Sequence, residues 1–209
     1  GREQADLLGK RLEKYDIEAV YSSQLIRAKE TADIINTHLN KPRIIDERWQ
    51  EANFGGMTGL SNEEMKEKYG DYLEKRAKMI EDIPYPDGGE NCRMVFERSF
   101  EALKNLTKEP YKNVCVVTHG GVLRALITGI IGADYKNWLT IGRQIENCSI
   151  SHILYDEKMG TFHIERLNDF AHFEDKDYLL TPVLPVKTPV RKEYDPCDTS
   201  HTQTVYNRP

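Results

Sequence analysis

Apolar residues recur every three or four positions in two stretches near the start of the chain, and each stretch predicts an amphipathic helix. Residues 3–14 place Ala5, Leu8 and Leu12 on one face. The second helix follows Ser22-Ser23, whose side-chain oxygens are suited to cap its first turn. Its apolar stripe consists of Leu25, Ala28, Ala32, Ile35 and Leu39.

Three further helices are predicted downstream. A charged helix over residues 61–81 begins at Ser61, and Glu64 is placed three residues later to complete a capping box. A Pro- and Gly-rich turn ends this helix, and another helix over residues 90–108 follows. The last is the strongly apolar segment VLRALITGII, which Gly132 closes.

Short β-rich runs alternate with these helices. The clearest is NVCVVT, a continuous apolar run of the kind that buried parallel strands use. A late pair of runs predicts a hairpin that turns near Gly160. The predicted strands span residues 17–21, 43–45, 113–118, 149–155 and 161–167.

This alternation indicates an α/β protein, a three-layer αβα sandwich around a mostly parallel central sheet, over residues 1–180. The remaining stretch, residues 181–209, has a different character. It holds five of the nine prolines and almost no periodic apolar pattern. We therefore predict a disordered, proline-rich tail after one folded domain.

Composition and charge narrow the range of functions. A formal net charge of −5 argues against a nucleic-acid binder, which normally presents a basic face. No apolar run approaches the length that spans a bilayer, so we expect no membrane association. The four cysteines are scattered, with no CxxC pair and no histidine at zinc spacing. We expect idle or buried thiols, no metal and no cofactor, in a cytoplasmic protein.

His119 is the strongest chemical signal. A buried strand that ends in His119-Gly120-Gly121 and opens a helix places an imidazole at the carboxyl edge of the sheet, where open α/β sheets bind ligands. The glycines allow a ligand to approach the backbone closely, and the helix start offers free amides to an anion. The alternative is a histidine that is simply buried and hydrogen-bonded at a strand end.

Two charged residues are also expected at the carboxyl edge of the sheet. Arg27 lies one helical turn beyond Ser22-Ser23, from where a guanidinium can donate two hydrogen bonds to a phosphate. Glu51 opens the glycine-rich loop 51–59, and a carboxyl group there can protonate a leaving alkoxide if its pKa is raised. The ordinary alternatives are an exposed helical arginine and a solvated carboxylate. Glu47 competes with Glu51 for the role of proton donor.

The other polar residues have structural interpretations. Glu90 is placed to complement the dipole of the helix that follows it. Asn168-Asp169 suit a loop cap, and His172 suits the surface. The remaining histidines, which we expect to be structural or solvent-facing, are His38, His152, His163 and His201.

Six segments occur in an order that characterises one family. They are YSSQLIRAKETA (21–32), EANFGGMTG (51–59), PDGGE (86–90) followed by Arg98, VVTHGGVLRAL (116–126), ENCSI (146–150) and LNDFAHF (167–173). This succession resembles the motifs of the histidine phosphatase superfamily, which includes the phosphoglycerate mutases, and the likeness spans residues 1–173.

The resemblance implies a phosphoglycerate mutase-like fold and a phosphoenzyme mechanism. In the family, a histidine of an N-terminal Arg-His-Gly motif attacks phosphorus. By likeness of motif, Arg27 and His119 would clamp the phosphoryl oxygens, and the amide of Gly120 would add a donor. Glu51 would protonate the leaving oxygen and then activate the water that cleaves the phosphohistidine. No metal is implied.

The chain departs from the family pattern in two places. It begins with GREQADLLGKRL, which resembles the helix that follows Arg-His-Gly, and the motif itself is absent. Since that motif belongs to a central strand whose loss would severely destabilise the domain, we interpret the chain as part of a longer gene product with its nucleophile upstream. Met57-Thr58 also stands where the family's phosphatases usually have Trp-Glu.

The resemblance favours a phosphatase that acts on small phosphate monoesters, similar to the alpha-ribazole and broad-specificity branch. The segment between Gly59 and Gly88 lacks the basic, tryptophan-containing stretch that mutases use for a second phosphate. Its cations alternate with acids, as on a solvated helix: Lys66, Lys68, Lys75, Arg76 and Lys78. The alternatives are a phosphoglycerate mutase and a non-catalytic phosphate-binding relative. We expect the protein to be a monomer or a homodimer. We expect its binding partner to be a small phosphorylated metabolite.

Overall fold

The computed structural model describes residues 1–142 and 144–182, so residues 183–209, which form most of the predicted tail, lie outside the described residues. The helices and strands are α1 (Arg2–Leu12), β1 (Ala19–Ser22), α2 (Ile26–Leu39), β2 (Arg43–Ile45), α3 (Asn62–Ala77), α4 (Cys92–Leu106), β3 (Val114–Val117), α5 (Gly120–Ile130), β4 (Ile150–Asp156) and β5 (Thr161–Asp169). Four short 3-10 turns accompany them: η1 (Glu47–Trp49), η2 (Gly55–Met57), η3 (Tyr135–Thr140) and η4 (Asp177–Leu179).

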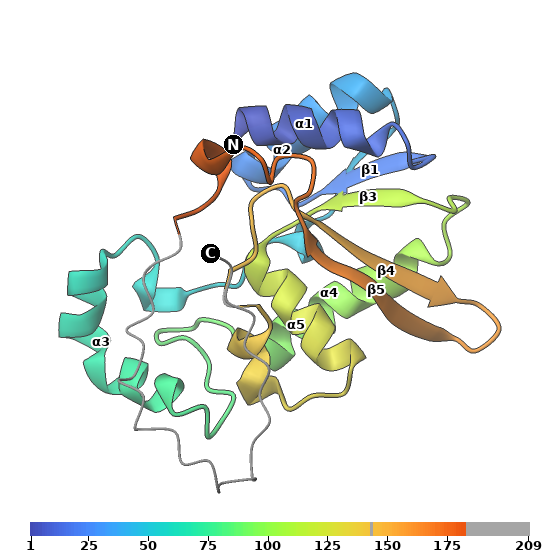
Figure 1. Cartoon of the computed structure of the whole chain (residues 1–209). Helices are drawn as coiled ribbons and strands as arrows, with labels where there is room; N and C mark the ends of the chain where they lie inside the picture. Colours follow the sequence, from blue (N-terminus) through green and yellow to red (C-terminus); the bar gives the residue numbers. More distant parts are fainter. Residues whose placement is uncertain (143, 183–209) are drawn as a thin grey trace, which may run out of the picture.

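The parallel sheet has the strand order β2-β1-β3. Tyr21 of β1 pairs with Ile44 on one side and with Val116 on the other, so β1 is the central strand and is buried throughout. β4 and β5 form a separate antiparallel hairpin that extends away from the sheet (Figure 1). The predicted α/β class and the parallel sheet are confirmed.

Helices cover both faces of the parallel sheet (Figure 1). On one face, α1 and α2 pack together and contribute Leu8, Leu12 and Ile35 to a core that reaches Val117 of β3. On the other face, α4 and α5 enclose a larger core. Its buried residues are Trp49, Ala52, Cys92, Val95, Ala102, Val122, Ala125, Leu126 and Trp138. The two cores with the sheet between them form the three predicted layers.

The start of α2 differs from the prediction. Ser22 and Ser23 are fully buried, and α2 begins only at Ile26 with Leu25 as its N-cap and no side-chain cap. The prediction that the serines cap this helix was wrong, because β1 continues through Ser22 and the Ser23 amide donates to the Val117 carbonyl at 3.3 Å. Ser23 instead accepts a hydrogen bond from the Leu25 amide at 3.3 Å.

The capping box of α3 is confirmed. The Glu64 amide donates to Ser61 Oγ at 3.2 Å, and the Ser61 amide donates to Glu64 Oε2 at 2.7 Å. The helix is shorter than the predicted span 61–81, because it ends at Ala77 and the chain turns at Met79, whose φ is positive at 47°. Helix α4 is likewise shorter than the predicted span 90–108.

The thiols of the described part of the chain are free. Burial raises the pKa of Cys115 to about 12 and the pKa of Cys148 to about 11, so both stay protonated at neutral pH. Cys92 is fully buried in the larger core. Among the residues that the structure describes, no helix combines the length and the apolar character needed to cross a membrane.

Candidate active site

His119 and Ser23 lie side by side at the carboxyl edge of the parallel sheet. Ser22 pairs with Val117, so β1 and β3 end at the same level. After each strand the backbone leaves the sheet and enters a helix. His119 is the N-cap of α5 with an extended backbone. Its Nε2 atom lies 2.8 Å from Ser23 Oγ. This hydrogen bond holds the imidazole over the strand ends, where parallel sheets bind ligands.

The imidazole of His119 is neutral at neutral pH. Burial lowers its pKa to about 4, and the positive charges of Arg27 and Arg98 act in the same direction. An anion that binds here would raise the pKa of His119 again, because it brings negative charge next to the ring. The surroundings of His119 are therefore electropositive and suited to a phosphate.

Arg27 lies in the first turn of α2 and is exposed. Its charge contributes to the lowered pKa of His119, which places the two residues in one electrostatic site. Across residues 1–142 and 144–182, no hydrogen bond or ion pair involves the Arg27 side chain. A guanidinium in this position has all its donors available for an anion.

Glu51 contacts the first turn of α5. Its Oε2 atom accepts a hydrogen bond from the Gly121 amide at 3.4 Å, and its Oε1 atom accepts one from the Ala52 amide at 2.9 Å. A Cβ atom at Gly121 would lie 2.3 Å from Oε1, so a side chain there would displace the carboxylate. Gly120, between His119 and Gly121, is thus flanked by the imidazole and the carboxylate. The competitor Glu47 lies in a different surface groove, with Ile45 and Asn105.

An arginine–glutamate pair anchors the Glu51 loop. The Arg98 guanidinium donates to both carboxylate oxygens of Glu90, at 2.7 and 2.9 Å, and to the main-chain carbonyls of Arg48 at 2.7 Å and Glu51 at 3.2 Å. Glu90 also accepts from the Asn53 amide at 2.8 Å. These five hydrogen bonds fix the backbone on both sides of Glu51.

Glu90 makes no hydrogen bond to the first turn of α4 in the described residues, so its predicted dipole role stays a prediction. The first amides of α4 are taken by other residues: Asn91 Oδ1 accepts from the Met94 amide at 2.9 Å, and Asp82 accepts from the Cys92 and Arg93 amides at 3.0 and 2.9 Å. Glu90, which precedes the N-cap Asn91, instead pairs with Arg98 of α4.

The sequence analysis missed three residues beside Glu51. Tyr85 is half-buried, and burial raises its pKa to about 12. The charges of Glu51, Arg76 and Arg124 also influence this pKa. The Arg76 Nη2 atom donates to Tyr85 Oη at 2.7 Å. The prediction that Arg76 belongs to a solvated face was wrong, because α3 turns this side chain inward against Tyr85 and Trp138. Charge alternation alone does not reveal which side of α3 is covered.

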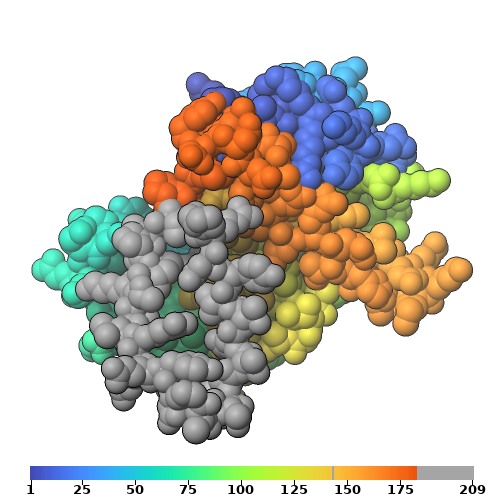
Figure 2. All heavy atoms as spheres, in the orientation of Figure 1, coloured from blue at the N-terminus to red at the C-terminus, as the bar shows by residue number. Residues whose placement is uncertain are grey.

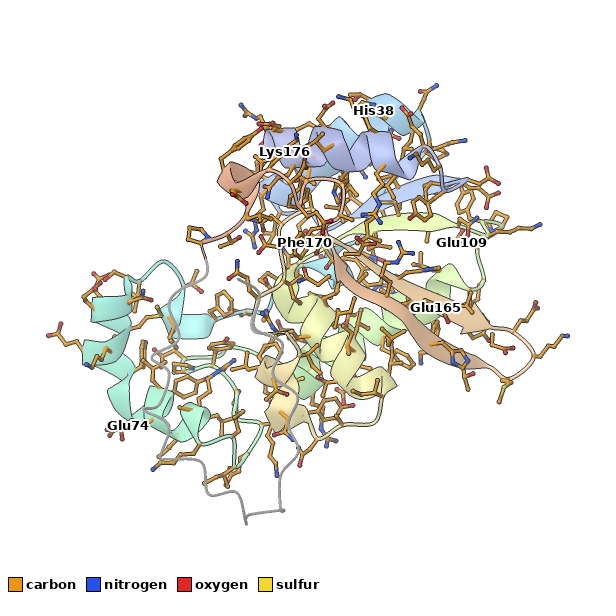
Figure 3. The ribbon with its side chains drawn as sticks, in the orientation of Figure 1. His38, Glu74, Glu109, Glu165, Phe170 and Lys176 are labelled. Atoms are coloured by element: carbon orange, nitrogen blue, oxygen red, sulfur yellow. The ribbon has the colours of Figure 1, made fainter. Side chains whose placement is uncertain are left out.

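His172 is half-buried, so its predicted place on the surface was wrong. Its Nδ1 atom lies 3.1 Å from Arg11 Nη1, and burial lowers its pKa. Arg11 also pairs with Asp169 at 2.8 Å. The segment after β5 folds back over α1 (Figure 2), where the carbonyl of Leu179 accepts from Gln4 at 2.8 Å. His38, which Figure 3 labels, fits its predicted structural role. Its Nε2 atom lies 2.8 Å from Asp6 on α1.

The fold and this edge together define an α/β sandwich in which an imidazole and a carboxylate lie at the first turn of α5. The family model "Histidine phosphatase superfamily (branch 1)" matches residues 1–169, and the chain belongs to this family. Within the described residues, no group of three or more histidine, cysteine or acidic side chains is arranged to hold a metal ion.

Known proteins similar to this chain include two from Arabidopsis thaliana. "Metal-independent phosphoserine phosphatase" is 33% identical over 183 residues, which cover 86% of this chain and 73% of the relative. "Phosphoglycerate mutase-like protein 4" is 31% identical over 186 residues, which cover 86% and 76%. The solved structure of Bacillus stearothermophilus YhfR superposes with a TM-score of 0.73 at 30% identity and covers 83% of this chain and 85% of that protein.

Proposed function

We propose that this chain is the greater part of a phosphatase that hydrolyses small phosphate monoesters through a phosphohistidine. The observation that carries the proposal is the arrangement at the first turn of α5, where the Glu51 carboxylate and the His119 imidazole lie on either side of Gly120. Membership of the histidine phosphatase superfamily supports this assignment.

We assign the roles of the site residues by their likeness to the family's motifs. Arg27, neutral His119 and the Gly120 amide donate hydrogen bonds to the phosphoryl oxygens and stabilise the charge that develops on them. The nucleophilic nitrogen forms a bond to phosphorus as the bond to the leaving oxygen breaks, and that oxygen takes the proton of Glu51. A water molecule then attacks phosphorus, gives a proton to Glu51 and releases phosphate from the nitrogen.

We place the nucleophile in an Arg-His-Gly segment that precedes Gly1. In the described sheets β3 pairs only with β1, which leaves its second edge without a partner strand. A strand added in parallel to that edge would end beside His119, because parallel strands end at the same side of a sheet. A histidine at the end of such a strand would face the phosphate that Arg27 and His119 hold. The name of the metal-independent phosphoserine phosphatase supports catalysis without a metal.

A phosphoglycerate mutase is the second candidate. Arg76 and Arg124 supply two cations near Tyr85 and Glu51, and a mutase needs cations for the second anionic group of its substrate. The similarity to "Phosphoglycerate mutase-like protein 4" also favours this candidate. The two activities differ in their products, since a phosphatase releases inorganic phosphate and a mutase returns an isomer.

The test uses the full natural chain. Rapid quenching with a ³²P-labelled monoester should trap a phosphoenzyme that is labile to acid and stable to base, as a phosphohistidine is. With a phosphoglycerate as substrate, free phosphate would support the phosphatase and the isomeric ester would support the mutase. Neither phosphoenzyme nor turnover, together with stabilisation by phosphate or vanadate in thermal unfolding, would instead indicate a non-catalytic phosphate-binding relative.

A further inference from the structure

The groove that contains Glu47 lies between α4 and the β1–β2 side of the parallel sheet, and its volume is about 560 Å³. Tyr21 of β1 and Ile44 of β2 are register partners, so their side chains lie on the same face of the sheet. Ala102 and Leu106 line the groove from the side of α4. None of the described residues that line it has a catalytic role in the proposed phosphatase. Its volume is that of a small-molecule site.

The groove extends from the carboxyl ends of the strands to their amino ends. Asp46, which directly follows β2, lines it at the carboxyl end. Glu109 and Tyr111 lie in the loop that precedes β3, so they line it at the amino end (Figure 3 labels Glu109). Since His119 follows β3, Glu109 and the candidate active site lie at opposite ends of the sheet.

Tyr21 is a buried polar side chain without a partner in this groove. It is only 6% exposed, and across residues 1–142 and 144–182 its hydroxyl takes part in no hydrogen bond. Burial raises the pKa of Tyr21, and Glu109, Tyr111 and Asp46 act in the same direction. The phenol oxygen therefore faces the groups that surround the groove. A buried hydroxyl without a partner lowers stability, and a ligand that bonds to it offsets this loss.

The charges in the groove favour a cation. Its lining holds the carboxylates of Asp46, Glu47 and Glu109 against a single guanidinium, that of Arg48. This guanidinium is already bound to Asp46, with Nη2 2.6 Å from Oδ2. The Glu109 carboxylate forms no hydrogen bond or ion pair with any residue that the structure describes, so its charge is uncompensated. An anion such as a phosphate ester would be repelled here.

Aromatic and aliphatic groups complete the lining. Tyr111 adds a second ring to that of Tyr21, and Ile44 and Leu106 supply aliphatic surface. Tyrosine rings and carboxylates both attract an ammonium ion. Aliphatic side chains bury the alkyl chain that such an ion carries. The composition of the groove therefore matches an organic amine.

We infer that this groove is a second ligand site and that its ligand is a primary alkylammonium ion. The ammonium group donates to the Tyr21 hydroxyl and to the Glu109 carboxylate, and the alkyl chain packs against Leu106. Free amines and lysine side chains both carry this group. Because the groove contains none of the proposed catalytic residues, the inference does not depend on the proposed phosphatase function.

Calorimetry on the full natural chain tests the site with n-pentylamine and 1-pentanol, which have the same alkyl chain and differ in the charged group. We expect n-pentylamine to bind saturably and about tenfold more tightly than 1-pentanol, since hydrogen bonds to a charged group contribute on this scale. Nα-acetyl-lysine methylamide carries the same ammonium group on a peptide-like backbone. Tighter binding of this amide than of n-pentylamine would identify a lysine side chain as the ligand, and weaker binding would identify a free amine.

Two variants locate the binding. Glu109→Gln changes an exposed side chain and should raise the Kd of n-pentylamine about tenfold. Glu157→Gln, in the exposed turn between β4 and β5, changes the net charge equally and should leave this Kd unchanged. Tyr21→Phe should raise the Kd about fivefold. It should not lower the unfolding midpoint of the amine-free protein, because the hydroxyl has no partner among the described residues.

Three results would overturn the inference. The first is the absence of saturable binding of either amine to the wild-type protein. The second is equal affinity for n-pentylamine and 1-pentanol, which would show that the positive charge is not recognised. The third is an unchanged Kd of n-pentylamine in Glu109→Gln or in Tyr21→Phe, which would place the bound amine elsewhere on this acidic protein.

Discussion

The Nε2 atom of His119 and the Oγ atom of Ser23 are 2.8 Å apart, which links the ends of β3 and β1 at the candidate site. Ser23 is fully buried, so its side chain is held in place by the surrounding atoms. The same hydroxyl accepts from the Leu25 amide at the start of α2. One buried side chain therefore sets the position of the imidazole relative to the helix that carries Arg27.

The lowered pKa of His119 makes the stability of the protein depend on pH. The pKa is about 4 in the folded protein against 6.5 for the free side chain, so the unfolded chain binds more protons between these values. The contribution is fully present above pH 6.5 and is lost as the pH falls toward 4. Between pH 7 and pH 5, the wild-type protein should lose about 2 kcal/mol more unfolding free energy than His119→Asn.

Urea unfolding at the two pH values measures this difference. His163→Gln, on exposed β5, is the control and should behave like the wild-type protein. The pKa of His172 is lowered too, but that contribution is common to all three proteins and cancels. If His119→Asn and the wild-type protein lose the same free energy, the buried neutral imidazole is excluded.

Glu51→Gln should harm substrates with poor leaving groups most. A glutamine cannot supply a proton, so an alkyl phosphate should lose about 100-fold or more in kcat, since general acid catalysis contributes on this scale. An activated aryl phosphate leaves without protonation and should lose less. Glu47→Gln is the matched control, because Glu47 lies in another groove, and should leave both rates unchanged. Equal losses on both substrates in Glu51→Gln would show that Glu51 is not the proton donor.

Gly121→Ala should lower turnover more than stability. The new methyl group would meet Glu51 Oε1 at 2.3 Å, and the carboxylate must then move away from the first turn of α5. We expect kcat to fall at least tenfold while the protein stays folded, since the carboxylate can rotate. Gly70→Ala is the control: a Cβ atom there meets nothing within 4 Å, and alanine should stabilise α3 by up to about 1 kcal/mol. Steady-state kinetics and thermal unfolding of both variants would settle the comparison.

Local patterns predicted the scaffold of this site well. The run NVCVVT forms β3, and the turn that follows puts His119 at the sheet edge, because a buried strand and a helix start are both properties of a few adjacent residues. The capping box of α3 was predicted for the same reason, since Ser61 and Glu64 are three residues apart. The parallel arrangement of the sheet followed from the order of strands and helices.

Partners that are distant in sequence account for the features that were not predicted. His172 is half-buried because Arg11, 161 positions earlier, lies against it. Arg76 turns inward because Tyr85 and Trp138 cover one side of α3, and nothing within the sequence of α3 itself indicates those rings. Only the tertiary structure shows these contacts, so the packing of Arg76 against the two rings could not be derived from the chain alone.

The contributions of Arg98 and Glu90 to the unfolding free energy should be strongly coupled. The two side chains are only 17% and 14% exposed, so Arg98→Met leaves a partly buried carboxylate without its guanidinium. We expect a loss of about 3 kcal/mol in unfolding free energy for Arg98→Met. Burial raises the pKa of Glu90, but the hydrogen bonds from Arg98 and Asn53 outweigh burial and lower it overall, which is why the pair is ionised at neutral pH.

A double-mutant cycle measures this coupling in urea unfolding at pH 7. Glu90→Gln combined with Arg98→Met should recover at least about 1 kcal/mol of the single-variant loss, because no uncompensated charge remains. Glu101→Gln, which removes the exposed partner of Arg48, is the control and should cost less than about 0.5 kcal/mol. Strict additivity of the two variants would show that the pair does not act as a unit. Arg98→Met should also lower kcat, because the Glu51 carbonyl loses the donor that holds its loop against α4.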